Sequence, residues 1–238
     1  MNRLKLVVLT GAGISAESGL KTFRDTDGLW EGYRIEEVAT PEAWRRNPKQ
    51  VLEFYNLRRE AARVALPNQA HQILAELEKD FDVQIITQNV DDLHERAGST
   101  QIIHLHGSLF EARSSVFSEL VYPWKKDQLD LGDLCARGTQ LRPNIVWFGE
   151  EVPLMPDATM HVADADIFLI VGTSLQVYPA AGLVDFLKPE IPILLVDPGD
   201  PLIRNKNRLI CYRELASSGM TKVREYLLTF RIEKSKTG

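Results

Sequence analysis

Four short runs of apolar, often β-branched residues divide this sequence, and helical patterns fill the spaces between them. The runs cover residues 4–10, 81–87, 166–173 and 192–197, each typical of a buried strand. The helical patterns, with apolar residues three and four apart, cover residues 48–65, 68–79 and 215–230. Strands that alternate with helices predict an α/β fold, a Rossmann-like parallel sheet with helices on both faces.

Two stretches interrupt this alternation. Residues 22–66 begin as a polar, glycine-containing loop and continue as a helical insertion, whereas residues 107–141 combine short β-like pieces with turn residues and predict a small module. We expect residues 1–238 to form a single unit. Its Rossmann-like large domain then comprises about residues 1–21, 67–106 and 142–238.

The composition excludes several classes of protein. With 238 residues, of which 44% are hydrophobic, the chain is long enough to bury a substantial core. A net charge of −5 gives no uniformly positive field for a nucleic-acid backbone, so we expect no nucleic-acid partner. Cys135 and Cys211 are its two cysteines, which excludes a disulfide scaffold and fits a reducing cytoplasm.

The sequence also lacks the pattern of a targeting or membrane segment. The first apolar run is interrupted by Lys5 and leads into glycines rather than a cleavage site, unlike a signal peptide. No uninterrupted apolar run approaches the ~20 residues of a membrane helix. We therefore expect a cytoplasmic protein with no membrane partner. For the oligomeric state we expect a monomer.

A glycine loop follows the first strand. It consists of Gly11, Ala12, Gly13, Ile14 and Ser15, with Ser18 close behind. Small residues at a helix start let a pyrophosphate approach backbone N–H groups at the positive end of the helix. The spacing departs from the G-x-G-x-x-G pattern because residue 16 is alanine, so an ordinary tight turn stays open as an alternative for this loop alone.

Polar residues gather where the other predicted strands end. They are residues 87–91, 104–107 and 172–174, besides the Thr22, Phe23 and Arg24 that follow the glycine loop. Ligands of an open α/β sheet bind outside the carboxyl ends of its strands. We therefore expect these clusters to meet at one edge of the sheet.

Longer motifs surround these clusters in a fixed order between residue 6 and about residue 185. They read GAGISAESGL, TFR, TQNVDDLH, HLHG, RPNIVWFGE and GTSLQVYPAAG. In these motifs the chain resembles the sirtuins, the NAD-dependent protein-lysine deacylases. The resemblance implies NAD as cofactor and acyl-lysine proteins as substrates.

The resemblance also implies the catalytic residues. In the family, the acyl-lysine carbonyl oxygen attacks the ribose of NAD as nicotinamide leaves, and a histidine then takes a proton from the ribose hydroxyls. His106 matches that histidine, and a neutral imidazole suits the step. A lone histidine at a strand end is otherwise a structural hydrogen bonder, which is our interpretation of His71, His94, His104 and His161.

Three residues of the TQNVDDLH motif match nicotinamide-pocket and ribose contacts. They are Gln88, Asn89 and Asp91. The resemblance implies that Asn89 orients the reacting end of NAD, as a second catalytic residue, and that Asp91 holds the carboxamide, whose donors and acceptors a carboxylate and an amide can match. An Asx turn at a strand end is the alternative.

Further cofactor contacts are implied by position. Phe23 and Arg24 match a loop that closes over NAD and excludes water. Besides the six glycine-loop residues, the matching contacts are Gly172, Thr173 and Ser174. Leu195 stands where the family has an adenosine-ribose asparagine, so we expect Asp197 to take the hydroxyls instead. Ala216 is expected to contact the adenine through its backbone.

The implied substrate residues form two groups. Val146, Trp147 and Phe148 resemble the edge to which a substrate peptide adds as a strand, although both aromatic residues could be plain core. Ala39, Tyr55 and Arg58 resemble the subgroup that removes succinyl and malonyl groups. Arg58 can fork two hydrogen bonds to a carboxylate, Tyr55 can add one, and Ala39 leaves space. The alternative is a core tyrosine and a solvated arginine.

The small module lacks the four cysteines that bind structural zinc in the family. Residues 108–141 contain only Cys135 and no histidine, and Ser114 lies where the first cysteine is expected, so we predict a module without metal. Large apolar side chains would stabilise it instead. They are Phe110, Val116, Phe117, Leu120, Val121, Tyr122, Trp124, Leu129, Leu131 and Leu134.

Three functions are compatible with these residues. The first is an NAD-dependent protein-lysine deacylase that removes succinyl and malonyl groups, and acetyl as well. An NAD glycohydrolase or ADP-ribosyltransferase would use the same cofactor site without an acyl pocket, which Tyr55 and Arg58 argue against. A weakly active NAD-binding interaction module would not need His106, Asn89 and Asp91 together.

Overall fold

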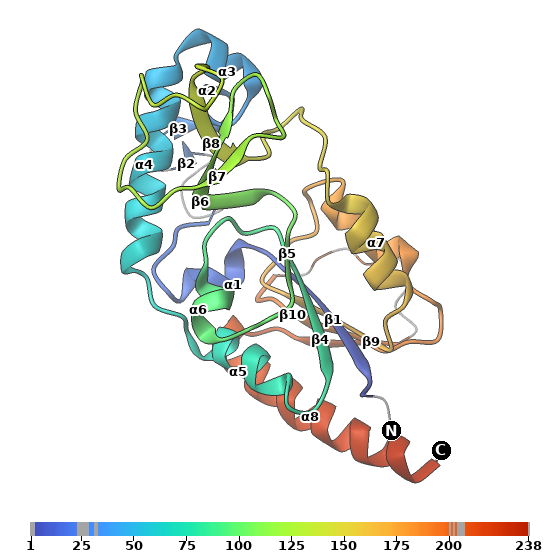
Figure 1. Ribbon diagram of the computed structural model, residues 1–238. Coiled ribbons are helices and arrows are strands. Elements are labelled where there is room, and N and C mark those ends of the chain that lie inside the picture. The colour runs from blue at the N-terminus through green and yellow to red at the C-terminus, as the bar shows by residue number, and fades with distance from the viewer. Residues whose placement is uncertain are drawn as a thin grey trace.

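Six parallel strands form the central sheet of the computed structural model, in the order β11-β10-β9-β1-β4-β5 (Figure 1). They are β1 (Lys5–Thr10), β4 (Asp82–Thr87), β5 (Ile102–His104), β9 (Ile167–Val171), β10 (Ile193–Val196) and β11 (Leu209–Tyr212). The structure describes residues 3–22, 29, 30, 33–199, 201, 203 and 208–237. Phe23 and Arg24 lie outside the described residues. The four predicted strands are all present in the sheet.

Helices cover both faces of this sheet, as predicted. On one face lie α5 (Gln69–Leu77) and α8 (Ala216–Thr237); on the other lie α7 (Met155–Ala163) and the 3₁₀ helix η1 (Ala180–Phe186) (Figure 1). Successive side chains of a strand point to opposite faces, so Leu6 and Val8 pack under α5 and α8 while Val7 and Leu9 pack under α7 and η1. A strand buried on both faces needs a continuous apolar run, which explains the sequence pattern.

The order in which strands are added to the sheet reverses at β1. From β1 it moves to β4 and β5 on one side, and it later returns to β9, β10 and β11 on the other side. The loop after β1 and the loop after β9 therefore diverge at a topological switch point, where ligands of such sheets bind. Two short helices follow this edge: α1 (Ala12–Ala16) after β1 and α6 (Leu93–Ala97) after β4.

A second lobe lies at the end of the molecule opposite the termini (Figure 1). It contains the hairpin β2 (Leu29–Trp30) and β3 (Tyr33–Arg34), the helices α2 (Ile35–Val38), α3 (Pro41–Arg46) and α4 (Pro48–Val64), and the antiparallel strands β6 (Gly107–Ser114), β7 (Val121–Pro123) and β8 (Leu141–Ile145). Thr40 and Asn47 cap α3 and α4, each followed by a proline at the first helical position. Strand β8 pairs with β6, so it lies with the module although its residues begin at the predicted boundary.

The module packs around a small apolar cluster. Its buried members are Leu52, Ala112, Trp124, Leu129, Cys135 and Leu141. The expectation for Trp124 and Leu129 is confirmed, whereas four other predicted core residues have exposed side chains. These are Val116, Val121, Leu131 and Leu134.

Hydrogen bonds surround Ser114, which stands where the family's first zinc-binding cysteine is expected. The Thr139 hydroxyl lies 2.7 Å from Ser114 Oγ and 3.0 Å from Cys135 Sγ. Ser114 Oγ also accepts the backbone N–H groups of Val116 and Phe117. Among the described residues, no three His, Cys, Asp or Glu side chains lie close enough together to hold a metal ion.

Helix α4 fastens the module to the rest of the lobe. Arg59 is fully buried and donates hydrogen bonds to the Leu109 carbonyl at 2.7 Å and to Asn56 Oδ1 at 2.6 Å. Burial lowers the pKa of Arg59 to about 10.

None of the helices in the described part of the chain is both long and apolar enough to cross a membrane.

Candidate active site

His106 lies just beyond β5, at the junction between the sheet and the module. Its Nδ1 is 3.0 Å from the Gln88 carbonyl oxygen, which can only accept, so Nδ1 carries the proton and Nε2 is left as an acceptor. Burial lowers the pKa of His106, so the imidazole is neutral at pH 7. The His106 carbonyl accepts the N–H of Val146, which joins this residue to the predicted substrate segment. His106 has the tautomer and charge of a general base.

Ser15 connects the glycine loop to the end of β4. Its hydroxyl donates to Asp91 Oδ2 at 3.1 Å and accepts Asn89 Nδ2 at 3.1 Å. Burial raises the pKa of Asp91, although hydrogen bonds from Leu93 and Ser15 oppose the shift. The structure thus brings three predicted cofactor residues together in one buried polar group. Together they offer the donors and acceptors that a carboxamide needs.

Two buried histidines lie behind this group. His71 Nε2 is 3.5 Å from Ser15 Oγ, and His94 Nε2 is 3.0 Å from the Thr10 hydroxyl. Burial lowers the pKa of His71 to about 4 and the pKa of His94 well below its ordinary value. Both rings are therefore neutral hydrogen-bonding partners.

His104 holds the backbone of Asn89. Its Nδ1 is 3.0 Å from the Asn89 carbonyl, and its Nε2 is 2.6 Å from Glu95 Oε1. Burial lowers the pKa of His104, but the hydrogen bond and charge of Glu95 outweigh burial and raise it overall. Glu95 is absent from the sequence prediction, since nothing in its local pattern points across to β5.

The glycine loop rests directly on the end of β9. The N–H of Gly13 donates to the Gly172 carbonyl at 2.8 Å, and Gly172 has φ +62°. A Cβ on Gly172 would lie 2.2 Å from the Ile14 nitrogen, so only glycine fits. Thr173 accepts a hydrogen bond from Gln88 Nε2 at 3.1 Å, which links the ends of β9 and β4.

The remaining predicted cofactor residues differ in what they expose. Ser18 accepts a hydrogen bond from Asn68, and Ser174 is half-buried beside Thr173. The side chains of Ile14 and Ala216 lie in the core beneath α5 and α8, so only their backbone can face a ligand. Ala12 is half-buried in the first turn of α1.

Leu195 does not lie at the cofactor edge of the sheet. Leu195 lies inside β10, with its side chain packed in the core beneath α7 and η1, so it cannot face an adenosine ribose. Asp197 is the first residue after that strand, at the carboxyl edge where polar ligand contacts arise. Its Oδ1 accepts the N–H of Gly199 at 2.8 Å. Of the two residues only Asp197 lies at that edge, and its contact with the ribose hydroxyls stays a prediction.

The segment after β8 is a turn rather than a strand edge. Strand β8 ends at Ile145, and Gly149 has φ +89°. The N–H of Val146 donates to His106, that of Phe148 to the Ala39 carbonyl, and that of Trp147 to Glu150. These three donors are therefore already used within the protein, and a peptide strand cannot pair with them.

The residues predicted to form the acyl pocket lie near this turn. Ala39, Tyr55 and Trp147 are buried in one apolar cluster, with Tyr55 only 1% exposed. Arg58, one turn later on α4, is partly buried and donates to the Lys21 carbonyl at 3.4 Å. Burial raises the pKa of both Tyr55 and Asp91, and the charge of Arg58 opposes both shifts. Arg58 thus lies within electrostatic range of both groups.

Glu150 anchors the turn and is a site residue that the sequence prediction missed. Its carboxylate accepts hydrogen bonds from Arg142 at 2.8 and 2.9 Å and from Arg113 at 3.2 Å. It also accepts the Trp147 N–H at 2.9 Å, and the Arg142 guanidinium lies 3.3 Å from the centre of the Trp147 ring. Only the register of β6 and β8 brings the two arginines together.

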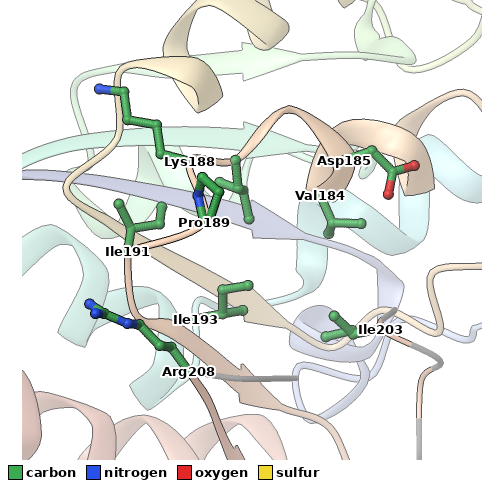
Figure 2. Close-up of a pocket in the computed structure, with 9 residues that line it drawn as sticks. Val184, Asp185, Lys188, Pro189, Ile191, Ile193, Ile203 and Arg208 are labelled. Atoms are coloured by element: carbon green, nitrogen blue, oxygen red, sulfur yellow. The ribbon is translucent and has the colours of Figure 1, made fainter. Parts of the chain in front are cut away.

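A separate cavity of about 140 Å³ lies away from these residues. Figure 2 shows residues that line it, among them Val184 of η1, Ile193 of β10, and the cations Lys188 and Arg208. None of the predicted site residues lines it.

Comparison with known proteins decides the family. The pattern that defines the Sir2 family matches residues 11–179, from the glycine loop past the end of β9. The chain belongs to the Sir2 family. The Sir2 match spans every strand-end cluster described above except Asp197 and Ala216.

Named relatives and solved Sir2 structures agree with this assignment. A Helicobacter pylori protein named NAD-dependent protein deacylase is 55% identical over 215 residues, covering 90% of this chain and 93% of that protein. A Bacteroides thetaiotaomicron protein of the same name is 48% identical over 228 residues, covering 94% and 97%. The crystal structure of a Sir2 homologue–NAD complex is 39% identical with a TM-score of 0.85, covering 95% of this chain and 90% of that one.

Proposed function

We propose that this Sir2 protein removes acidic acyl groups, such as succinyl and malonyl, from protein lysines, and acetyl groups as well. The coarser activity, NAD-dependent protein deacylation, follows from the family and from relatives that carry that name over nearly their whole length. NAD is the cofactor, as in the Sir2 homologue–NAD complex. The preference for acidic groups rests on one observation: Tyr55 and Arg58 lie one turn apart on α4, with Arg58 in electrostatic range of both Tyr55 and Asp91.

The residues at the carboxyl edge fit NAD. The glycine loop and the end of β9 leave backbone rather than side chains at the switch point, while Asn89, Asp91 and Ser15 offer matched donors and acceptors. Bound NAD supplies the ribose that receives the acyl group as nicotinamide leaves. His106 Nε2 then takes a ribose hydroxyl proton, because its Nδ1 proton is held by the Gln88 carbonyl.

Acidic-acyl recognition follows from charge. Arg58 places a cation near the buried Tyr55 hydroxyl, and Ala39 adds only a methyl group to the same cluster. A carboxylate accepts a forked pair of hydrogen bonds from arginine, which is stronger than any contact that an acetyl group can offer. A succinyl or malonyl carboxylate therefore gains an interaction that an acetyl group lacks.

Replacement of Arg58 by methionine tests this preference. Loss of a charge-assisted hydrogen bond, worth about 1.5–3 kcal/mol, lowers kcat/KM for a succinyl-lysine peptide by about 10- to 100-fold more than for the acetyl peptide. Lys49→Met, an exposed position on the same helix, is the matched control and leaves the ratio unchanged. Equal loss with both peptides would refute the proposal.

The competing NAD-consuming activities are separated by their products. A deacylase releases nicotinamide together with free lysine peptide and O-acyl-ADP-ribose, and only when the acylated peptide is present. Nicotinamide release at the same rate without acylated peptide would indicate a glycohydrolase. Binding of NAD without either product would leave an interaction module.

We also infer that the small module folds without zinc. Ser114, at the position expected of the family's first cysteine, and Cys135 both bond to Thr139, and one thiol is far from the four N or S ligands of a structural site. The buried cluster around Trp124 and the hydrogen bonds of Arg59 supply the stabilisation instead.

A further inference from the structure

Trp147 and Tyr55 bury two polar atoms side by side at the acyl end of the site. Trp147 is 2% exposed and Tyr55 is 1% exposed, and their ring centroids are 6.5 Å apart. Among the described residues, neither Trp147 Nε1 nor the Tyr55 hydroxyl has a hydrogen-bond partner. Buried polar atoms without partners are rare in folded proteins, so a pair of them in one place requires a reason.

Trp147 Nε1 is close enough to the Tyr55 hydroxyl to affect its pKa. Burial raises the pKa of Tyr55, and the Trp147 N–H opposes this shift as a hydrogen-bond donor would, although the geometry does not complete a bond. An indole N–H can only donate, whereas a phenol can both donate and accept. The only hydrogen bond possible between the two groups runs from Trp147 Nε1 to the Tyr55 oxygen.

Three further contacts hold Trp147 in place. The Arg142 guanidinium lies 3.3 Å from its ring centre, and Glu150 accepts its backbone N–H at 2.9 Å. Trp44 packs against its ring, with centroids 5.8 Å apart. A ring fixed in this way can orient a neighbouring group instead of moving with it.

We propose that Trp147 is a positioning residue for Tyr55 and thereby determines acyl specificity. When an acidic acyl group enters, the indole N–H donates to the Tyr55 oxygen, and the Tyr55 proton is then directed to the acyl carboxylate. Tyr55 alone could donate its proton in several directions. With Trp147 as donor, its oxygen is occupied and only the outward direction remains.

This inference rests on the proposed preference for acidic acyl groups and names a second residue that sets it. Trp147→Phe keeps an aromatic ring in the cluster and deletes the N–H. The expected result is a fall of about 3- to 10-fold in the ratio of succinyl to acetyl kcat/KM, the size of one neutral hydrogen bond, carried mainly by KM for the succinyl peptide. Trp124→Phe, which makes the same change in the separate cluster of the module, where Trp124 Nε1 donates to the Gln128 carbonyl, is the control and leaves the ratio unchanged.

A double-mutant cycle separates positioning from packing. If Trp147 acts through Tyr55, Trp147→Phe changes the ratio in the native background and has no further effect in Tyr55→Phe. An undiminished effect in the Tyr55→Phe background would overturn the inference. So would equal loss with both peptides, which is the result of a purely structural role.

A second measurement covers the case in which Trp147→Phe folds poorly. The chain has four tryptophans, so four indole N–H signals are resolvable in a ¹H–¹⁵N spectrum. With NAD-free protein, succinyl-lysine peptide is expected to shift one indole signal downfield in the native protein but not in Tyr55→Phe. No such shift in the native protein would contradict the inference.

The two proposals fail differently. If Arg58→Met leaves the succinyl-to-acetyl ratio unchanged, the acidic-acyl preference itself is wrong. If Arg58→Met lowers that ratio and Trp147→Phe does not, only the role of Trp147 is wrong.

Discussion

Replacement of Glu150 by glutamine removes the one carboxylate that holds Arg142, Arg113 and the Trp147 backbone together. Glu150 is 20% exposed, and the two arginine side chains are 7% and 16% exposed. Breaking a fully buried ion pair costs about 3–5 kcal/mol; because glutamine keeps one acceptor oxygen, we expect about 2–3 kcal/mol here. For a chain of this length the melting temperature then falls by about 4–12 °C.

An exposed ion pair in the same module provides the control. Glu119 pairs with Arg137 at 3.3 Å, with side chains 62% and 54% exposed, so Glu119→Gln costs no more than about 1 kcal/mol. Circular dichroism melts of both variants at pH 7 give the comparison, and steady-state kinetics give KM for the acyl peptide and for NAD. We expect Glu150→Gln to raise KM for the peptide more than KM for NAD. A melting temperature no lower than that of Glu119→Gln would refute the reasoning.

The pH dependence tests whether charge is the cause. Burial raises the pKa of Glu150, but Arg142, Arg113 and the Trp147 N–H outweigh it, so the pKa in the folded protein is lowered. A carboxylate with a lowered pKa stabilises the fold above its unfolded pKa of about 4.3, and this stabilisation is lost as pH falls through the folded value. The stability gap between the native protein and Glu150→Gln should be full at pH 7 and narrow below about pH 4. A gap that stays constant would indicate lost packing instead.

Two further predictions concern the base and the module. Burial lowers the pKa of His106, so kcat/KM should stay high at pH 7 and fall only as the pH drops through a value below about 6.5. His106→Asn should abolish deacylation at every pH. A fall of kcat/KM centred above pH 7 would contradict this assignment. The purified protein should contain less than ~0.1 zinc per chain and melt at the same temperature with or without EDTA, and stoichiometric zinc would contradict a metal-free module. Ser114→Ala leaves two backbone N–H groups without their acceptor, so it should lower the free energy of unfolding by about 1–2 kcal/mol.

The sequence was sufficient wherever one physical rule decides position. The strand runs predict the sheet because a strand buried on both faces has to be apolar throughout. The meeting of Asn89, Asp91 and Ser15 follows from the common carboxyl edge of β1 and β4, whatever the details of packing. Such rules locate an edge, but they do not define individual contacts.

Contacts that depend on register or on where a strand ends were not predictable. Arg113 and Arg142 face each other because they are paired across β6 and β8, and nothing near Glu150 in the sequence shows this. Leu195 and Asp197 differ by two positions, so a strand that ends at Val196 buries the first and presents the second. In the same way, Gly149 turns a segment that reads like a strand.

The small module and the predicted acyl pocket are connected through the same strands. Arg113 lies on β6 and Arg142 on β8, next to the end of these strands where Ser114 and Cys135 bond to Thr139. The same strands supply the cations that fix Glu150, and Glu150 in turn fixes the turn that carries Trp147. Substitutions that loosen the module should therefore raise KM for the acyl peptide before they affect NAD binding. The predicted cofactor residues lie at the edge of the six-stranded sheet, and the hydrogen bonds between them involve no residue of β6 or β8.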